Sequence, residues 1–155
     1  STNNVSMLDG KFTFVLPKGF TANPLPAGPT GAKGTMYTNQ ATKTVVIAAE
    51  NQIAGGTSVK DNDNEFLDGS LASFIDDQRK ALPDFNKLTE KSLTQKSSGL
   101  GVRQVDSTAT QGGGQTLNTT LLAASGKRMA LVQVISRASD KSGHDALVKT
   151  ILKDK

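Results

Sequence analysis

Two segments of this sequence carry apolar side chains at nearly every position, and they restrict the folds that the chain can adopt. Successive side chains of a strand point to opposite faces of its sheet, so a strand that is apolar on both faces needs cover on both sides. In residues 43–50, Val45, Ile47 and Ala49 point to one face, and Val46 and Ala48 point to the other. In residues 128–136, one face carries Met129, Leu131 and Ile135, and the other carries Ala130, Val132 and Val134. We predict that both segments are interior strands, with residues 128–136 in a central position.

Two other segments have the periodicity of amphipathic helices. Residues 63–82 carry a stripe at a spacing of about 3.6 residues, formed by Leu67, Leu71, Phe74, Ile75, Gln78 and Leu82. Asn62, with Glu65 three positions later, fits a capping box at the start of this helix. A last helix is predicted to start at Asp140 or Ser142, and its apolar residues are Leu147, Val148, Ile151 and Leu152.

The N-terminal part of the chain combines a short strand with a long loop. In residues 11–16 apolar side chains alternate with others, which predicts a strand with one buried face. That face carries Phe12, Phe14 and Leu16. Residues 17–34 contain four of the five prolines together with four glycines, a composition typical of loops. We expect residues 1–6 to form a polar tether ahead of a folded domain that spans residues 7–155.

Residues 39–42 join the strand over residues 36–38 to residues 43–50, and the later strands are joined by turns that contain glycine, a residue that adopts the positive backbone angles of tight hairpins. These predicted strands cover residues 36–38, 86–96, 102–110 and 115–124. A chain of 155 residues forms one domain, because chains usually divide only above about 250 residues. The sequence therefore predicts a single α+β domain, an antiparallel sheet flanked by helices on both faces.

The side chains that usually carry catalysis are scarce. The chain has no cysteine, and His144 is its only histidine, which we expect to be exposed at the start of a surface helix. No Gly-x-Ser-x-Gly elbow is present. The adjacent carboxylates Asp76 and Asp77 lie on the solvent side of the predicted helix, where nothing would shift a pKa for acid–base work. We predict no catalytic residue, so the chain is not expected to be an enzyme.

One acidic segment resembles the opening of a calcium-binding loop. Asp61, Asp63 and Glu65 alternate as the first ligands of an EF-hand do. Phe66 stands where that loop needs glycine, and Ala72 stands where it needs glutamate. We therefore interpret the segment as a polar loop that caps the following helix, and we predict no metal site.

The other short motifs are interpreted as parts of turns and strands. Gly99-Leu-Gly101 and the triple glycine at 112–114 lack the spacing and the Lys-Ser/Thr ending of a phosphate-binding loop. Asn118 begins an Asn-Thr-Thr glycosylation sequon, but the sequon falls inside a predicted strand and is treated as chance. No cofactor-binding residue is predicted.

The charge of the chain is moderately positive, with a formal net charge of +4. The densest basic groups are Lys87, Lys91 and Lys96, and the tail residues Lys149, Lys153 and Lys155. No run of five basic residues occurs, and the chain has one tyrosine and no tryptophan with which to stack on bases. A mixed solvated surface is expected, and no direct binding of nucleic acid.

Several strings, taken in order, resemble the DcrB family of enterobacterial envelope lipoproteins. They are MLDGKFTFVLP at 7–17, MYTN at 36–39 with KTVVIAA at 43–49, DQR at 77–79, VRQVD at 102–106 and MALVQV at 129–134. The resemblance extends over residues 6–153. It implies a PsbP-like fold, also called Mog-like, in which an antiparallel sheet lies between helices. The family has no catalytic motif that could be transferred to this chain.

The resemblance also implies a location and a function. Relatives of this kind are exported, lipidated at a cysteine that is absent from this chain, and held in the periplasm by a tether to the inner membrane. The chain would then be a non-enzymatic accessory factor with a protein partner in the envelope, associated with phage adsorption, DNA entry and envelope integrity. The alternative is a chaperone-like module that binds an apolar segment of a secreted or membrane protein. A hydrolase with a concealed site is a third hypothesis.

The N-terminal strand raises a question of assembly. The strand over residues 12–16 is joined to the rest of the chain only through residues 17–34, so it could pair within its own chain or with that of a neighbour. Exchange of one element between two copies is a low-cost route to a dimer. A homodimer formed through this strand is therefore an open possibility from the sequence.

Overall fold

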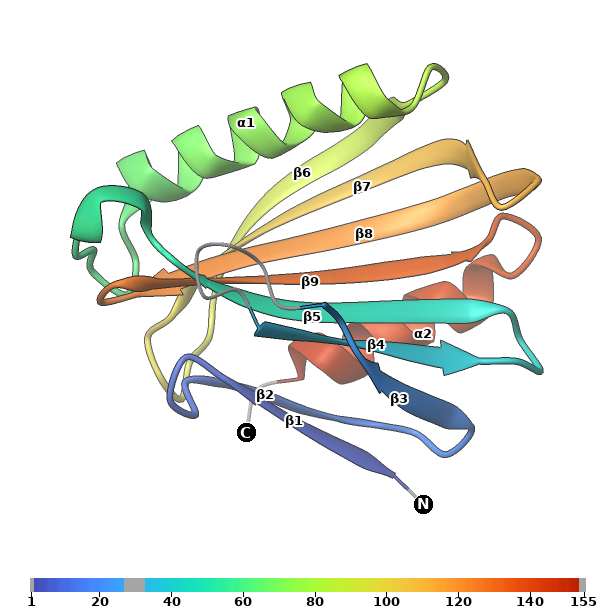
Figure 1. Cartoon of the computed structure of the whole chain (residues 1–155), viewed down its shortest axis with the longest axis horizontal. Helices are drawn as coiled ribbons and strands as arrows, with labels where there is room; N and C mark the ends of the chain where they lie inside the picture. The colour runs from blue at the N-terminus through green and yellow to red at the C-terminus, as the bar shows by residue number, and fades with distance from the viewer. Residues whose placement is uncertain (1, 27–32, 154–155) are drawn as a thin grey trace.

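Seven antiparallel strands form the main sheet of the computed structural model, which describes residues 2–26 and 33–153 (Figure 1). Their order across the sheet is β3-β4-β5-β9-β8-β7-β6, and β1 and β2 form a separate two-stranded sheet. The elements are β1 (Asn3–Met7), β2 (Phe12–Leu16), β3 (Phe20–Pro24), β4 (Lys33–Asn39), β5 (Thr44–Gln52), the 3-10 turn η1 (Ala54–Gly56), α1 (Asn64–Ala81), β6 (Asn86–Thr94), β7 (Gly101–Gln111), β8 (Gly114–Ser125), β9 (Arg128–Arg137) and α2 (Lys141–Leu152). The α+β class and the antiparallel sheet predicted from the sequence are confirmed.

The two segments that are apolar on both faces are interior strands, as predicted. β5 lies between β4 and β9, and β9 is the middle strand of the seven. Val46, Val132 and Val134 are each at most 1% exposed. In both strands one apolar face is buried, and the other face is half-buried.

The two helices pack on different clusters of the sheet. α1 packs through Leu71 and Ile75 against Leu122 of β8 and Val105 of β7. α2 packs in the larger cluster, which includes Leu121 of β8 and Ala130, Val132 and Val134 of β9. Because Leu121 and Leu122 are consecutive in one strand, their side chains point to opposite faces of the sheet.

The N-terminal segment is part of the fold, which corrects the prediction of a tether over residues 1–6. β1 pairs with β2 in an antiparallel hairpin, with Val5 opposite Phe14 and Met7 opposite Phe12. Val5 and Met7 are buried in the same cluster as α2. The buried face predicted for the strand over residues 11–16 is confirmed, but that strand pairs with β1 and not with the main sheet. The homodimer through this strand stays a prediction.

The proline-rich stretch is only partly a loop, which corrects the prediction for residues 17–34. Phe20–Pro24 forms β3, an edge strand of the main sheet that pairs with β4. Proline is tolerated on an edge strand, where a missing N–H need not break a ladder. The rest of the predicted loop includes residues 27–32, which lie outside the described residues.

The start of α1 differs by one residue from the predicted capping box, whereas α2 is capped at Asp140, one of its two predicted starts. Asp63, not Asn62, is the N-cap of α1, and its Oδ1 accepts a hydrogen bond from the backbone N–H of Phe66 at 3.1 Å. Asp140 caps α2 in the same way, accepting from the backbone N–H of Gly143 at 3.2 Å. Aspartate is as good an N-cap as asparagine, so the cap of α1 can stand one residue later than predicted.

Candidate functional site

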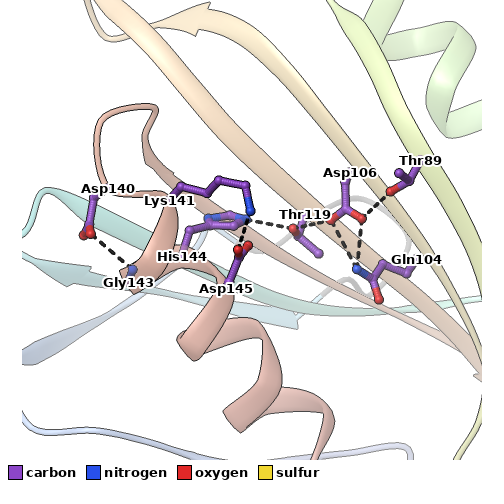
Figure 2. A network of polar contacts seen from close by, with 9 residues as sticks. All are labelled: Thr89, Gln104, Asp106, Thr119, Asp140, Lys141, Gly143, His144 and Asp145. Carbon is purple, nitrogen blue, oxygen red and sulfur yellow. Dashed lines mark hydrogen bonds and ion pairs between the residues drawn. The ribbon is translucent and has the colours of Figure 1, made fainter.

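A groove of about 590 Å³ lies between α2 and the strands β6, β7 and β8. The three strands supply a row of polar side chains to its floor, and α2 supplies the opposite wall with both buried and exposed side chains, among them His144 and Asp145 (Figure 2). The apolar members of its lining are Leu88, Leu117, Val148 and Leu152. Cavities of this size are in the range of about 300–1,000 Å³ that is usual for ligand sites.

The polar floor is assembled by the register of three neighbouring strands. Thr89 of β6 lies directly opposite Asp106 of β7, and Asp106 lies directly opposite Thr119 of β8. Gln104 precedes Asp106 by two positions, so both side chains point to the same face of β7. The four side chains therefore form one polar row under α2.

The carboxylate of Asp106 is the centre of this row (Figure 2). Thr89 Oγ1 donates to its Oδ2 at 2.6 Å, and Thr119 Oγ1 donates to its Oδ1 at 2.6 Å. Gln104 Nε2 donates to the two carboxylate oxygens at 3.2 and 3.0 Å. Three side chains from three strands therefore converge on one carboxylate.

His144 of α2 continues the same chain of hydrogen bonds. Its Nε2 is 2.8 Å from Thr119 Oγ1, and its Nδ1 is 2.7 Å from Ser136 Oγ. Thr119 has one hydroxyl hydrogen, which it donates to Asp106, so the contact with Thr119 requires a hydrogen on His144 Nε2. In the neutral imidazole Nδ1 is then the acceptor, and Ser136 donates to it.

Burial lowers the pKa of His144 from its ordinary value, because the charged imidazolium loses its hydration. The neighbouring carboxylates Asp145, Asp106 and Asp140 raise this pKa, and Lys141 lowers it. Burial is the largest of these effects. His144 is therefore favoured in its neutral form, which agrees with the hydrogen-bond chain.

The burial of His144 corrects the prediction of an exposed helix residue. The side chain is 5% exposed and belongs to the inward face of α2. The buried residues of that face are His144, Leu147, Val148 and Ile151. The histidine stands three, four and seven positions before the other three, which is the spacing of one helix face. That spacing was visible in the sequence and could have placed His144 inside.

The hydrogen-bonded Ser136 and His144 do not form an accessible nucleophile. Ser136 is 2% exposed and Thr119 is 1% exposed, so a substrate has little access to either hydroxyl. The Thr119 hydrogen is already donated to Asp106. The arrangement instead holds α2 on β8 and β9 by buried hydrogen bonds, each worth about 1 kcal/mol.

The acidic segment at 61–65 is used for structure, as the helix-capping interpretation predicts. Asp61 accepts hydrogen bonds from Lys11 Nζ, at 2.8 Å, and from Ser125 Oγ. These hydrogen bonds, that of Lys11 first, hold the pKa of Asp61 below its usual range. Asp63 caps α1. Within residues 2–26 and 33–153, no three His, Cys, Asp or Glu side chains are grouped so as to hold a metal ion.

The other singled-out motifs lie in turns, in a strand and on a helix surface. Gly112 and Gly113 form the turn between β7 and β8, with φ of 59° and 84°, which confirms the predicted turn. Asn118 is 7% exposed within β8, where its Oδ1 accepts from Thr116 Oγ1 at 3.0 Å. Asp76 forms an exposed ion pair with Lys80 on α1.

The groove also brings together basic residues that are far apart in the sequence. Lys91 comes from β6, and Lys141 and Lys149 come from α2, which Lys153 directly follows. The sequence predicted only a mixed solvated surface, because no run of five basic residues occurs and Lys91 is 50 residues away from Lys141. The fold concentrates them around one concave site.

No protein-family model matches the chain. No curated protein matches its sequence. Solved structures do match. The cyanobacterial PsbP protein CyanoP from Synechocystis has a TM-score of 0.66 at 8% identity, covering 97% of this chain and 91% of that chain. LpqN, involved in cell envelope biogenesis of Mycobacterium tuberculosis, has a TM-score of 0.52 at 13% identity over 97% and 87% of the two chains.

A protein of unknown function from Pseudomonas aeruginosa has a TM-score of 0.53 at 14% identity, over 96% of this chain and 91% of that chain. At such low identities these likenesses concern the fold. The chain therefore has a PsbP-like fold. None of the helices in the described ranges is long and apolar enough to cross a membrane.

Proposed function

We propose that this chain is a non-enzymatic accessory domain of the bacterial cell envelope, and that it binds a protein partner in the groove between α2 and strands β6, β7 and β8. The groove carries the proposal, because it combines a size suited to a ligand with a polar floor whose groups already bond to one another. Such a floor can recognise a partner by its shape and charge, and it presents no accessible nucleophile to that partner. LpqN, whose description refers to cell envelope biogenesis, shares the fold.

The finer identity of the proposed function rests on the sequence resemblance to the DcrB family. By that resemblance the protein is a lipoprotein of the periplasm, tethered to the inner membrane by a lipid on a preceding cysteine. An association with phage adsorption, DNA entry and envelope integrity belongs to the same proposal.

Fractionation of the full-length gene product tests the location. We expect the protein in the membrane fraction, with labelled fatty acid incorporated at one cysteine, and accessible to protease once the outer membrane is opened. Replacement of that cysteine by serine should release the protein into the soluble periplasm. A full-length product that remains in the cytosol without lipid contradicts the location.

A chaperone-like module is the second candidate, and one observation favours it. A wider groove of about 800 Å³ lies between α1 and β9 and has an apolar part that an amphipathic helix could cover. The apolar residues of that part are Phe66, Phe74, Leu122, Met129 and Leu131. Leu131 is partly buried there, as Phe74 is. This site would take an apolar segment in place of a folded partner.

Photo-crosslinking from single positions distinguishes the two candidates. We expect a benzophenone amino acid at Leu88, on the rim of the first groove, to give one discrete adduct in native cells. The same group at Ser73, in the second groove, tests the chaperone-like alternative. Lys18 is exposed in a turn outside both grooves and is the matched control. Adducts from Lys18 as strong as those from Leu88, or none from Leu88, would contradict the proposed site.

A further inference from the structure

The carboxylates that line the groove are already compensated within the chain. Asp106 accepts hydrogen bonds from three neighbouring side chains. Asp145 pairs with Lys141 at 2.6 Å, and this contact holds the pKa of Asp145 below its usual range. Neither carboxylate is therefore the natural partner of a cation brought by a ligand.

The remaining lysines of the groove are not compensated in this way. Lys91, Lys149 and Lys153 form no salt bridge with any residue that the structure describes. Lys91 extends from the strand side of the groove, and Lys149 and Lys153 come from the helix side and its end. Like charges on two walls of a concave site add their potentials and attract anions into it.

The same groove offers apolar surface next to these charges. Leu88 is 52% exposed. In the described part of the chain, Val15, at 40%, is the other large apolar side chain that is well exposed. Leu117, Val148 and Leu152 line the groove with Leu88. None of the described lining residues is phenylalanine, tyrosine or tryptophan, and the His144 ring is buried, so the site lacks the exposed stacking platforms that bind nucleic acid bases.

From this combination we propose that the groove binds an acidic, amphipathic peptide segment of a protein partner. The carboxylates of the peptide would lie against Lys91, Lys149 and Lys153. Its apolar side chains would lie against Leu88 and the apolar lining residues of α2, Val148 and Leu152. A peptide chain can enter a concavity and meet lysines on both walls, whereas a flat anionic membrane would touch only the rims. The inference rests on the proposed function and specifies the chemistry of the partner.

A synthetic probe tests the inference directly. A fluorescent ten-residue peptide of alternating glutamate and leucine is titrated with the domain, and binding is followed by anisotropy at about 0.05 M and about 0.3 M salt. We expect saturable binding that weakens with salt, and no binding of the same peptide with lysine in place of glutamate. The double variant Lys91→Gln/Lys149→Gln should raise the Kd by roughly fivefold, since each exposed ion pair contributes little by itself.

The control variant removes the same charge elsewhere. Lys18→Gln/Lys60→Gln changes two exposed lysines that do not line the groove and should bind the probe as the unchanged domain does. Equal losses in both variants, or no binding of the acidic probe, would overturn the inference. Binding to vesicles of phosphatidylglycerol that abolishes probe binding would instead assign the lysines to a membrane. If Leu88 still crosslinks a partner while the probe fails, the proposed function stands and only the chemistry of the partner is wrong.

Discussion

Replacement of Phe14 by alanine is expected to lower the free energy of unfolding by about 3–5 kcal/mol, the usual cost of truncating a buried phenylalanine. Phe14 is 1% exposed, and its ring lies edge-on to that of Phe12 with the centroids 5.9 Å apart. The hairpin of β1 and β2 packs in the same cluster as α2. A loss of this size is a large part of the roughly 5–15 kcal/mol that stabilises a typical domain.

Val15 provides the matched control on the same strand. Its side chain is 40% exposed, on the opposite face of β2. Val15→Ala should change the free energy of unfolding by no more than about 0.5 kcal/mol. Urea denaturation followed by circular dichroism measures both variants. Similar losses in the two variants would mean that the hairpin is not packed against the core in solution.

Replacement of His144 by glutamine is expected to lower stability by about 1–3 kcal/mol at pH 8, because buried hydrogen-bonding partners lose their geometry. It should also remove a dependence of stability on pH. Burial holds the pKa of His144 in the folded chain below its value in the unfolded chain. The unfolded state therefore binds the proton first, and stability falls as pH drops below about 6.5 toward the folded-state pKa.

A change in stability between pH 8 and pH 5 can be assigned to His144, because it is the only histidine of the chain. Asp61, Asp84 and Asp145 have lowered pKa values, and their contribution is lost only in a separate, more acidic range. Ala146→Gln, at an exposed position of the same helix, should keep the pH dependence of the unchanged domain. Thermal melts between pH 8 and pH 5 decide the matter. A His144→Gln variant with the same slope as the unchanged domain would disprove this role of the histidine.

The hydrogen bonds of His144 have a consequence for the groove. Protonation adds a hydrogen at Nδ1, so Ser136 can no longer donate to that atom. The contact that holds α2 to β9 must then rearrange. Since α2 is one wall of the groove, its stability and the stability of the binding site depend on the same buried side chain.

Much of the sheet could be predicted because strand patterns are local. Apolar side chains on both faces of residues 43–50 and 128–136 favour an interior position wherever those strands lie, and both segments are interior strands. The prediction of a tether over residues 1–6 was wrong, and Val5 is the only apolar side chain of that segment. Its burial depends on a partner hairpin strand, which no local pattern in residues 1–6 reveals.

The two interior strands, the helix stripes and the glycine turns were determined by the sequence itself, because side-chain periodicity and backbone freedom act over a few neighbouring residues. The groove was decided only by the tertiary structure. Its acidic centre depends on the register that aligns Thr89, Asp106 and Thr119, and its basic walls depend on α2 lying beside β6. Register and helix placement result from contacts between distant segments, which a single sequence does not display.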